Sequence, residues 1–137
     1  MAIDYGQART GVAVSDPTGS IAGEAWTIVQ RDREALVQTI AQAAASRGVE
    51  AIVVGLPKNM DGSEGFRARL SAQFADSLRD ISGLSVSLWD ERLTTVDAHH
   101  ILNNANRRGK KRKSVIDAVA ATLILEGYLG TLGGAPV

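Results

Sequence analysis

Short apolar stretches separated by turn-forming residues fill the first third of the chain. Residues 2–5 and 10–15 read as two strands joined by a hairpin turn over residues 6–9, in which Gly6 can take a positive φ angle. A second turn is predicted by Asp16-Pro17-Thr18-Gly19, and the β-branched run Thr27-Ile28-Val29 predicts a third strand over residues 25–30. This pattern indicates a three-stranded meander.

The middle of the chain changes from strand-like to helical spacing of its apolar residues. Asp32 is a candidate cap for a helix that runs to about residue 47, with an apolar face formed by Leu36, Val37, Ile40 and Ala44. Residues 51–54 are wholly apolar, which is typical of a strand buried on both faces. A polar loop over residues 55–65 precedes a second helix, whose apolar stripe consists of Phe66, Leu70, Phe74, Leu78 and Ile81.

The last third completes an alternation of strands and helices. Residues 84–89 alternate between apolar side chains and serine, which predicts a fifth strand. Thr94 and Asp97 have the spacing of a capping box for a short helix to about residue 104, and Ser114 and Asp117 repeat that spacing at the start of a last helix to about residue 129. The order βββαβαβα, with the short helix before the last, predicts an α/β fold of the ribonuclease H-like kind: a mixed five-stranded sheet with helices on both faces.

Composition limits the class of protein. The length of 137 residues fits a single domain over residues 1–137, with a frayed tail over 130–137, and the absence of cysteine excludes disulfides and thiolate metal sites. No apolar run approaches the ~18 residues of a membrane span, and the first residues lack the layout of a signal peptide. We therefore expect a cytoplasmic protein that does not enter a membrane.

The net charge of zero conceals one strongly basic segment. Six basic residues and no acid stand between positions 107 and 113: Arg107, Arg108, Lys110, Lys111, Arg112 and Lys113. Removing these six from the 15 basic residues leaves nine against 15 acidic residues, a net charge of −6 for the rest of the chain. A basic loop of this kind attracts phosphates without reading a base sequence. It favours binding of a folded RNA or a DNA junction by shape.

Three acidic residues stand where apolar or turn residues are usual. Asp4 closes the apolar start, Glu91 follows the predicted fifth strand, and Asp117 lies in the otherwise apolar segment 115–121. An isolated carboxylate in apolar surroundings is costly, so it is usually paired, protonated or bound to a cation. In the predicted fold these positions can converge at one edge of the sheet. If they do, we expect the compensating charge to be a divalent metal ion.

Four motifs span nearly the whole chain. They are Ile3-Asp4-Tyr5-Gly6 with the segment 9–16, Gly55-Leu56-Pro57, Asp90-Glu91-Arg92-Leu93-Thr94-Thr95, and Lys110-Lys111-Arg112-Lys113 followed by Ile116-Asp117-Ala118-Val119-Ala120-Ala121. In this order they resemble the motifs of the YqgF/RuvX family of RNase H-like nucleases. Any one of them alone would be a weak signal, whereas the four together are specific.

The resemblance implies a metal-dependent nuclease in which Asp4, Glu91 and Asp117 are the catalytic carboxylates and metal ligands. The implied cofactor is Mg²⁺ or Mn²⁺, as two ions ~3.5–4 Å apart, and such hard cations prefer oxygen ligands. Asp4 is expected to bridge the ions, and whether Asp90 joins the set is open. Members of the family act on the 5′ end of the 16S rRNA precursor or on Holliday junctions. Structured RNA, branched DNA and the ribosome are therefore the implied partners.

Basic residues near the acids are candidates for binding nucleic acid. The guanidinium fork of Arg92 suits phosphate oxygens, and Arg9 at the hairpin tip is equally consistent with a phosphate contact and with a solvated side chain. Lys58 follows the Gly55-Leu56-Pro57 motif in a loop that can approach a ligand or simply connect a strand to a helix. The remaining candidates are Arg107, Arg108, Lys110, Lys111, Arg112 and Lys113.

Other interpretations of the same residues stay open. Asp117 fits a capping box with Ser114 and could be purely structural. A non-catalytic nucleic-acid or ribosome-binding module is the main alternative function, and a phosphotransferase is a weaker one, since 137 residues leave no room for a second lobe. A resolvase would need a two-fold homodimer to make paired cuts, whereas an rRNA nuclease would not. The adjacent His99 and His100 would point about 100° apart on a helix, so we interpret them as surface or packing residues.

Overall fold

A mixed five-stranded sheet forms the centre of the molecule. The computed structural model describes residues 1–19, 21–93 and 109–132. The strands are β1 (Ala2–Asp4), β2 (Arg9–Ser15), β3 (Ala22–Val29), β4 (Ala51–Leu56) and β5 (Ser85–Asp90), and their order in the sheet is β3-β2-β1-β4-β5. β1, β2 and β3 pair antiparallel, whereas β4 runs parallel to both β1 and β5. The predicted meander and mixed sheet are confirmed.

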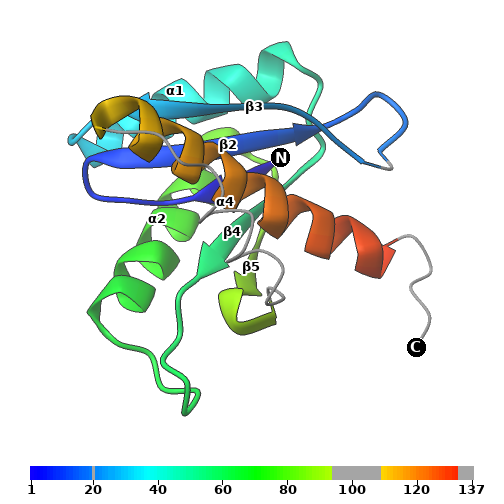
Figure 1. The fold of residues 1–137 in the computed structure, drawn as a ribbon. Coiled ribbons are helices and arrows are strands. Elements are labelled where there is room, and N and C mark those ends of the chain that lie inside the picture. The colour runs from blue at the N-terminus through cyan, green and yellow to red at the C-terminus, as the bar shows by residue number, and fades with distance from the viewer. Residues whose placement is uncertain (20, 94–108, 133–137) are drawn as a thin grey trace.

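Helices cover both faces of this sheet (Figure 1). They are α1 (Arg33–Ser46), α2 (Phe66–Ser82) and α4 (Gly109–Leu132), and the short 3₁₀ helix η1 (Glu91–Leu93) follows β5. α1 and α2 pack on one face, and α4 crosses the other face over β1, β2, β3 and β4. The predicted helix from Thr94 to residue 104, with Asp97, His99 and His100, lies outside the described residues. Among the described helices, none combines the length and apolar character needed to span a bilayer.

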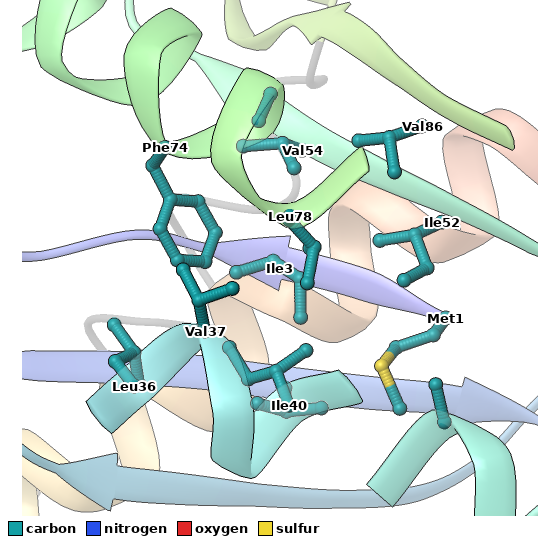
Figure 2. Close-up of a cluster of buried hydrophobic side chains, with 13 residues drawn as sticks. Met1, Ile3, Leu36, Val37, Ile40, Ile52, Val54, Phe74, Leu78 and Val86 are labelled. Atoms are coloured by element: carbon teal, nitrogen blue, oxygen red, sulfur yellow. The ribbon is translucent and has the colours of Figure 1, made fainter. Parts of the chain in front are cut away.

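The larger core lies between the sheet and the helices α1 and α2 (Figure 2). The face of α1 predicted from helical spacing is the one that is buried, and it consists of Leu36, Val37, Ile40 and Ala44. Asp32 caps this helix as expected, because its Oδ1 accepts a hydrogen bond from the backbone N–H of Glu34 at 3.2 Å. From α2, the buried ring of Phe74 stacks on Tyr5 with 4.4 Å between ring centroids.

The predicted apolar stripe of α2 is only partly right. Phe74 and Leu78 are buried, but Phe66 and Ile81 are 62% and 51% exposed. These two stand in the first and last turns of the helix, where fewer neighbouring atoms can cover a side chain. The buried face is instead completed by small residues, Ala68, Ser71 and Ala75. They allow the helix to lie close to the sheet.

The turn between β1 and β2 differs from the prediction. Gly6 does not take a positive φ angle. A side chain at this position would collide with the carbonyl oxygen of Arg9, so glycine is required for space rather than for backbone conformation. The buried hydroxyl of Thr10 closes the turn by bonding both the N–H and the carbonyl of Gly6 at 3.3 Å.

The last helix begins earlier than the sequence predicted. α4 starts at Gly109, so Lys110, Lys111, Arg112 and Lys113 belong to the helix and not to a loop before it. Lysine and arginine are good helix formers, and no proline interrupts the segment. Asp117 therefore lies about two turns inside α4 rather than in its first turn. The capping box predicted for Ser114 and Asp117 is wrong.

Candidate functional site

Asp4 ends the central strand and faces α4. Side chains alternate along a strand, so Asp4 shares its face with Ala2. Ala2 is buried in the smaller core cluster, together with the α4 residues Ala121, Ile124 and Leu125. Asp4 is therefore directed toward the face that α4 covers, at the carboxyl end of β1.

Gly11 brings the backbone of α4 close to Asp4. The register of β1 and β2 places Gly11 opposite Asp4. A Cβ atom on Gly11 would collide with the backbone carbonyl of Asp117, and its distance to the N of Ala118 would be 3.4 Å. The missing side chain thus lets α4 rest directly on β2, which delivers Asp117 to the neighbourhood of Asp4.

Gly55 has the same effect on the other side of β1. Ile3 pairs with Val54, so Gly55 lies beside Asp4 in the adjacent strand β4. The Cδ and Cγ atoms of Glu91 lie 3.2 and 3.3 Å from the position that a Cβ on Gly55 would take. Glu91, which begins η1 directly after β5, therefore extends across β4 toward Asp4.

The electrostatics of Asp4 reflect this convergence. Its pKa is raised from 3.8 to about 7, first by burial and then by the nearby charges of Glu91 and Asp117. Burial also raises the pKa of Glu91, and Asp90 adds to that rise. Arg67 acts in the opposite direction on both Asp4 and Glu91. The two carboxyls thus stand in an environment that disfavours their charged forms.

Asp117 is held by Arg9. The Nε of Arg9 donates to Oδ2 of Asp117 at 2.9 Å, and the two side chains are 23% and 22% exposed. Within the described residues, no group of three histidine, cysteine, aspartate or glutamate side chains is arranged to hold a metal ion. The three acids therefore lie at one end of the sheet but do not form a ready metal site, and one of them, Asp117, is bonded to an arginine.

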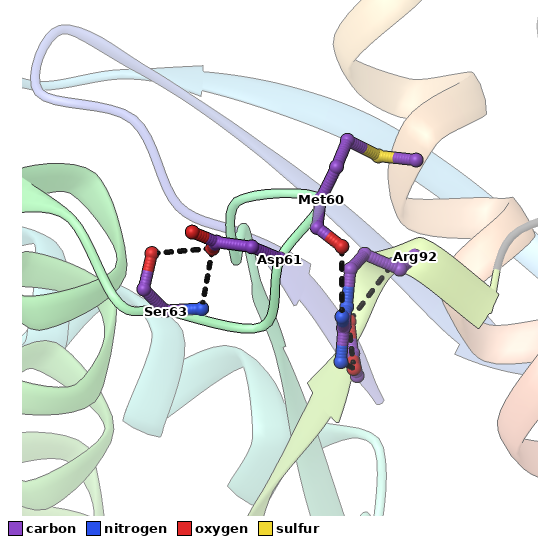
Figure 3. A network of polar contacts seen from close by, with 5 residues as sticks. Met60, Asp61, Ser63 and Arg92 are labelled. Atoms are coloured by element: carbon purple, nitrogen blue, oxygen red, sulfur yellow. Dashed lines mark hydrogen bonds and ion pairs between the residues drawn. The ribbon is translucent and has the colours of Figure 1, made fainter.

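Asp90 is bonded by Arg92, which Figure 3 shows beside the loop that carries Met60 and Asp61. Arg92 donates to both carboxylate oxygens of Asp90, with the shortest contact at 2.7 Å from Nη2 to Oδ2, and its backbone N–H adds a bond of 2.9 Å to Oδ1. These bonds lower the pKa of Asp90 to about 2. Nη1 of Arg92 also donates to the carbonyl of Met60 at 3.4 Å, which joins η1 to the loop after β4.

The loop after β4 is folded on itself beside this network. β4 extends through Leu56, so Gly55 and Leu56 are strand residues and not part of the predicted loop. Asn59 bonds Ser63 through both its backbone N–H, at 2.9 Å, and its side-chain Nδ2, at 3.0 Å. Lys58 is partly buried and lies near enough to Asp90 to lower the pKa of that carboxyl.

Of the basic candidates, Arg9 bonds Asp117, and Arg92 and Lys58 lie near Asp90. Lys110, Lys111, Arg112 and Lys113 precede Asp117 on α4 by one to two turns, whereas Arg107 and Arg108 lie outside the described residues. Sequence reasoning does not single out Arg67, because an arginine in the first turn of a helix carries no distinguishing signal. It also misses Gly11, whose role depends on a helix more than 100 residues away.

The chain resembles known proteins along nearly its whole length. A model of the RuvX family, described as Holliday junction resolvase, matches residues 1–131. The chain belongs to the RuvX family. A RuvX-like relative from Halothermothrix orenii, named "Putative pre-16S rRNA nuclease", is 46% identical over 129 residues, which cover 94% of this chain and 92% of the relative. A relative of the same name from Moorella thermoacetica is 45% identical over 133 residues, covering 97% and 95%. RuvX is thus a family of nucleases.

The fold of this RuvX chain is similar to those of solved RuvC structures. The structure titled "T. thermophilus RuvC in complex with Holliday junction substrate" matches with a TM-score of 0.60 at 12% identity, and covers 97% of this chain and 94% of that one. A second structure, of Thermus thermophilus RuvC, has a TM-score of 0.56 at 11% identity. At these identities the likeness establishes the shared RNase H-like fold.

Proposed function

We propose that this RuvX protein hydrolyses phosphodiester bonds in structured nucleic acid with the help of divalent metal ions bound by Asp4, Glu91 and Asp117. The observation that carries the proposal is the perturbed carboxyl of Asp4, whose pKa of about 7 results from burial beside two other acids. Perturbed acids of this kind cluster at functional sites. A cation would remove the repulsion among them.

The donor set supports a hard cation. All three side chains offer carboxylate oxygens, the ligands that Mg²⁺ and Mn²⁺ prefer, and the described chain has no thiolate to compete. Gly11 and Gly55 keep two flanks of Asp4 free of side-chain atoms, so that the other two acids can approach it. Asp117 can join this set of ligands if its carboxylate gives up the hydrogen bond from Arg9 and binds the ion instead.

Two ions at this position would supply an activated water, neutralisation of the phosphate and stabilisation of the leaving oxygen. The residues of the chain would hold these ions and orient the substrate beside them. Asp4 would hold the ions together with Glu91 on one side of it and Asp117 on the other. Arg67, which already offsets the charge of Asp4 and Glu91, is positioned to attract the phosphate of a substrate.

Substrate capture is assigned to the basic residues at this end of the molecule. Lys110, Lys111, Arg112 and Lys113 lead along α4 into the acidic site, and Lys58 and Arg92 flank it on the side of β5. Such contacts carry affinity and orientation rather than recognition of a base sequence. The names of the relatives favour the 5′ end of the 16S rRNA precursor as substrate, and the family description favours a Holliday junction.

Side-by-side cleavage of both substrates tests the proposal. The protein is incubated with a labelled rRNA precursor and with a four-way DNA junction, with Mn²⁺, with Mg²⁺ or with EDTA, and the product ends are mapped. We expect cleavage that requires the metal and is lost in Asp4→Asn. Asp80→Asn is the matched control, because Asp80 is an exposed acid on the opposite side of the sheet.

Robust cleavage by Asp4→Asn would refute the assignment of the site. Binding of either substrate without cleavage, unaffected by loss of all three acids but abolished by neutralising the basic segment, would establish the non-catalytic alternative. Paired symmetric cuts in the junction would in addition require a two-fold dimer, which sedimentation of the bound protein would reveal.

A further inference from the structure

The ion pair between Arg9 and Asp117 joins two residues of the proposed active site that are 108 positions apart in the chain. Its donor is the Nε of Arg9 and its acceptor is Oδ2 of Asp117, at 2.9 Å. About a quarter or less of each side chain is exposed, at 23% and 22%. The pair is thus partly shielded from solvent, where charge-assisted hydrogen bonds are stronger than at the surface.

Both ends of the pair are fixed by the backbone. Arg9 begins β2 and pairs with Val29 of the adjacent strand β3. The hydroxyl of Thr10 closes the turn that precedes Arg9. On the other side, the carbonyl of Asp117 lies directly over Gly11. The packing of α4 on β2 therefore brings the two side chains within bonding distance, while the side chains themselves can still rotate.

The three acids differ in their partners. Among the residues that the structure describes, Asp117 has a guanidinium bonded to its carboxylate, whereas the carboxylates of Asp4 and Glu91 receive no hydrogen bond. A carboxylate oxygen that accepts from an arginine has fewer lone pairs for a cation, and the positive charge of the arginine repels that cation. Arg9 thus competes with a metal ion for the same carboxylate.

We infer that Arg9 is a positioning residue that keeps Asp117 out of the metal-binding set until a phosphate of the nucleic acid takes over its guanidinium. The inference rests on the proposed function, and it adds an order of events. A phosphate group offers the oxygen geometry that the arginine fork prefers. When Arg9 turns to the phosphate, Asp117 becomes available as the third carboxylate. Binding of nucleic acid therefore completes the metal site, and by linkage the metal strengthens binding of nucleic acid by the same factor.

A double-mutant cycle on metal affinity tests this role without measuring activity. Binding of Mn²⁺ is followed from the electron paramagnetic resonance signal of the free ion, in the absence of nucleic acid, for the wild type, Arg9→Gln, Asp117→Asn and the double variant. We expect Arg9→Gln to bind Mn²⁺ about five- to tenfold more tightly than the wild type, which is a typical size for coupling between sites. In the Asp117→Asn background the gain should fall below about twofold.

Arg67→Gln is the matched control for charge. Like Arg9→Gln, it removes one positive charge, and this charge acts on Asp4 and Glu91. Arg67 has no bond to Asp117, so any gain in Mn²⁺ affinity from Arg67→Gln should persist in the Asp117→Asn background. Circular dichroism melts establish that each variant folds. If Arg9→Gln does not fold, Arg9→Lys replaces it in the same cycle, with a smaller gain expected because the charge is retained.

Addition of a short DNA oligonucleotide gives the second arm, after subtraction of the Mn²⁺ that the oligonucleotide binds alone. The wild type should gain affinity for Mn²⁺ and Arg9→Gln should not. An Arg9→Gln gain that is equally large in the Asp117→Asn background, or no gain at all, would overturn the inference while leaving the proposed metal site intact. Absence of Mn²⁺ binding in every variant, with and without the oligonucleotide, would overturn the proposed function as well.

Discussion

Replacement of Asp4 by asparagine should stabilise the metal-free protein at neutral and alkaline pH. The unfolded chain releases the Asp4 proton near pH 3.8, whereas the folded protein keeps it to about pH 7. The folded state therefore binds more protons between these values, and its stability falls as the pH rises through them. Asparagine has nearly the same shape and carries no charge, so Asp4→Asn does not suffer this loss.

The size of the effect follows from the pKa shift. Each pKa unit corresponds to about 1.4 kcal/mol, so a shift from 3.8 to about 7 costs the ionised form up to ~4 kcal/mol above pH 7. Because the side chain is only partly buried, solvent screening reduces this figure, and we expect about 2 kcal/mol. For a domain of this length that is roughly 6–10 °C in Tm. At pH 5 only about a third of the difference should remain.

Thermal unfolding followed by circular dichroism measures this difference between pH 5 and pH 8.5 with EDTA present. Asp80→Asn serves as the control, because it removes an exposed carboxyl from the helix on the opposite side of the sheet. Equal Tm values for the wild type and Asp4→Asn at pH 8.5 would show that the ionised Asp4 carboxylate does not destabilise the folded protein. A difference that does not shrink on acidification would do the same.

Three further predictions address the metal, the packing of α4 and the basic segment. Mn²⁺ or Mg²⁺ at millimolar concentration should raise the Tm of the wild type but not of Asp4→Asn, because a ligand stabilises only the state that binds it; equal shifts would place the ion elsewhere. In chemical denaturation, Gly127→Ala should lower the free energy of unfolding by about 1–2 kcal/mol, because the added Cβ would lie 2.8 Å from the Trp89 ring. Gly130→Ala is the control: no atom lies within 4 Å of its added Cβ, so the free energy of unfolding should stay unchanged or rise by up to ~1 kcal/mol. Replacing Lys110, Lys111, Arg112 and Lys113 by glutamine should reduce the slope of log affinity against log salt by up to about 3–4 units for either nucleic acid, and an unchanged slope would exclude these residues from phosphate contact.

Local patterns predicted most of the fold. The buried face of α1 follows from helical spacing alone, and the antiparallel meander of β1, β2 and β3 follows from its turns and short connections. The start of α4 could not be predicted in this way, because lysine and arginine favour a helix yet are equally common in solvated loops. The exposed ends of α2 were missed because spacing identifies a face but not how far the neighbouring elements cover it.

In the candidate site, too, local patterns predicted some features and only the structure reveals the others. Asp4 and Glu91 could be placed near each other because Asp4 lies at the end of one strand and Glu91 follows another, and these positions can converge at one edge of the predicted sheet. The bond between Arg9 and Asp117 could not be predicted, since the two residues are 108 positions apart and nothing in the sequence indicates that α4 packs over the start of β2. Likewise, only the structure reveals that Asp90 is bonded by Arg92 and belongs to a network of its own.

Anomalous diffraction from crystals grown with Mn²⁺ and an oligonucleotide would locate the metal ions and the Arg9 side chain in one experiment. We expect Mn²⁺ peaks at the carboxyl end of β1, ligated by Asp4, Glu91 and Asp117, with the guanidinium of Arg9 turned from Asp117 to a phosphate. Peaks remote from Asp4, or no peak while the nucleic acid is bound, would contradict it.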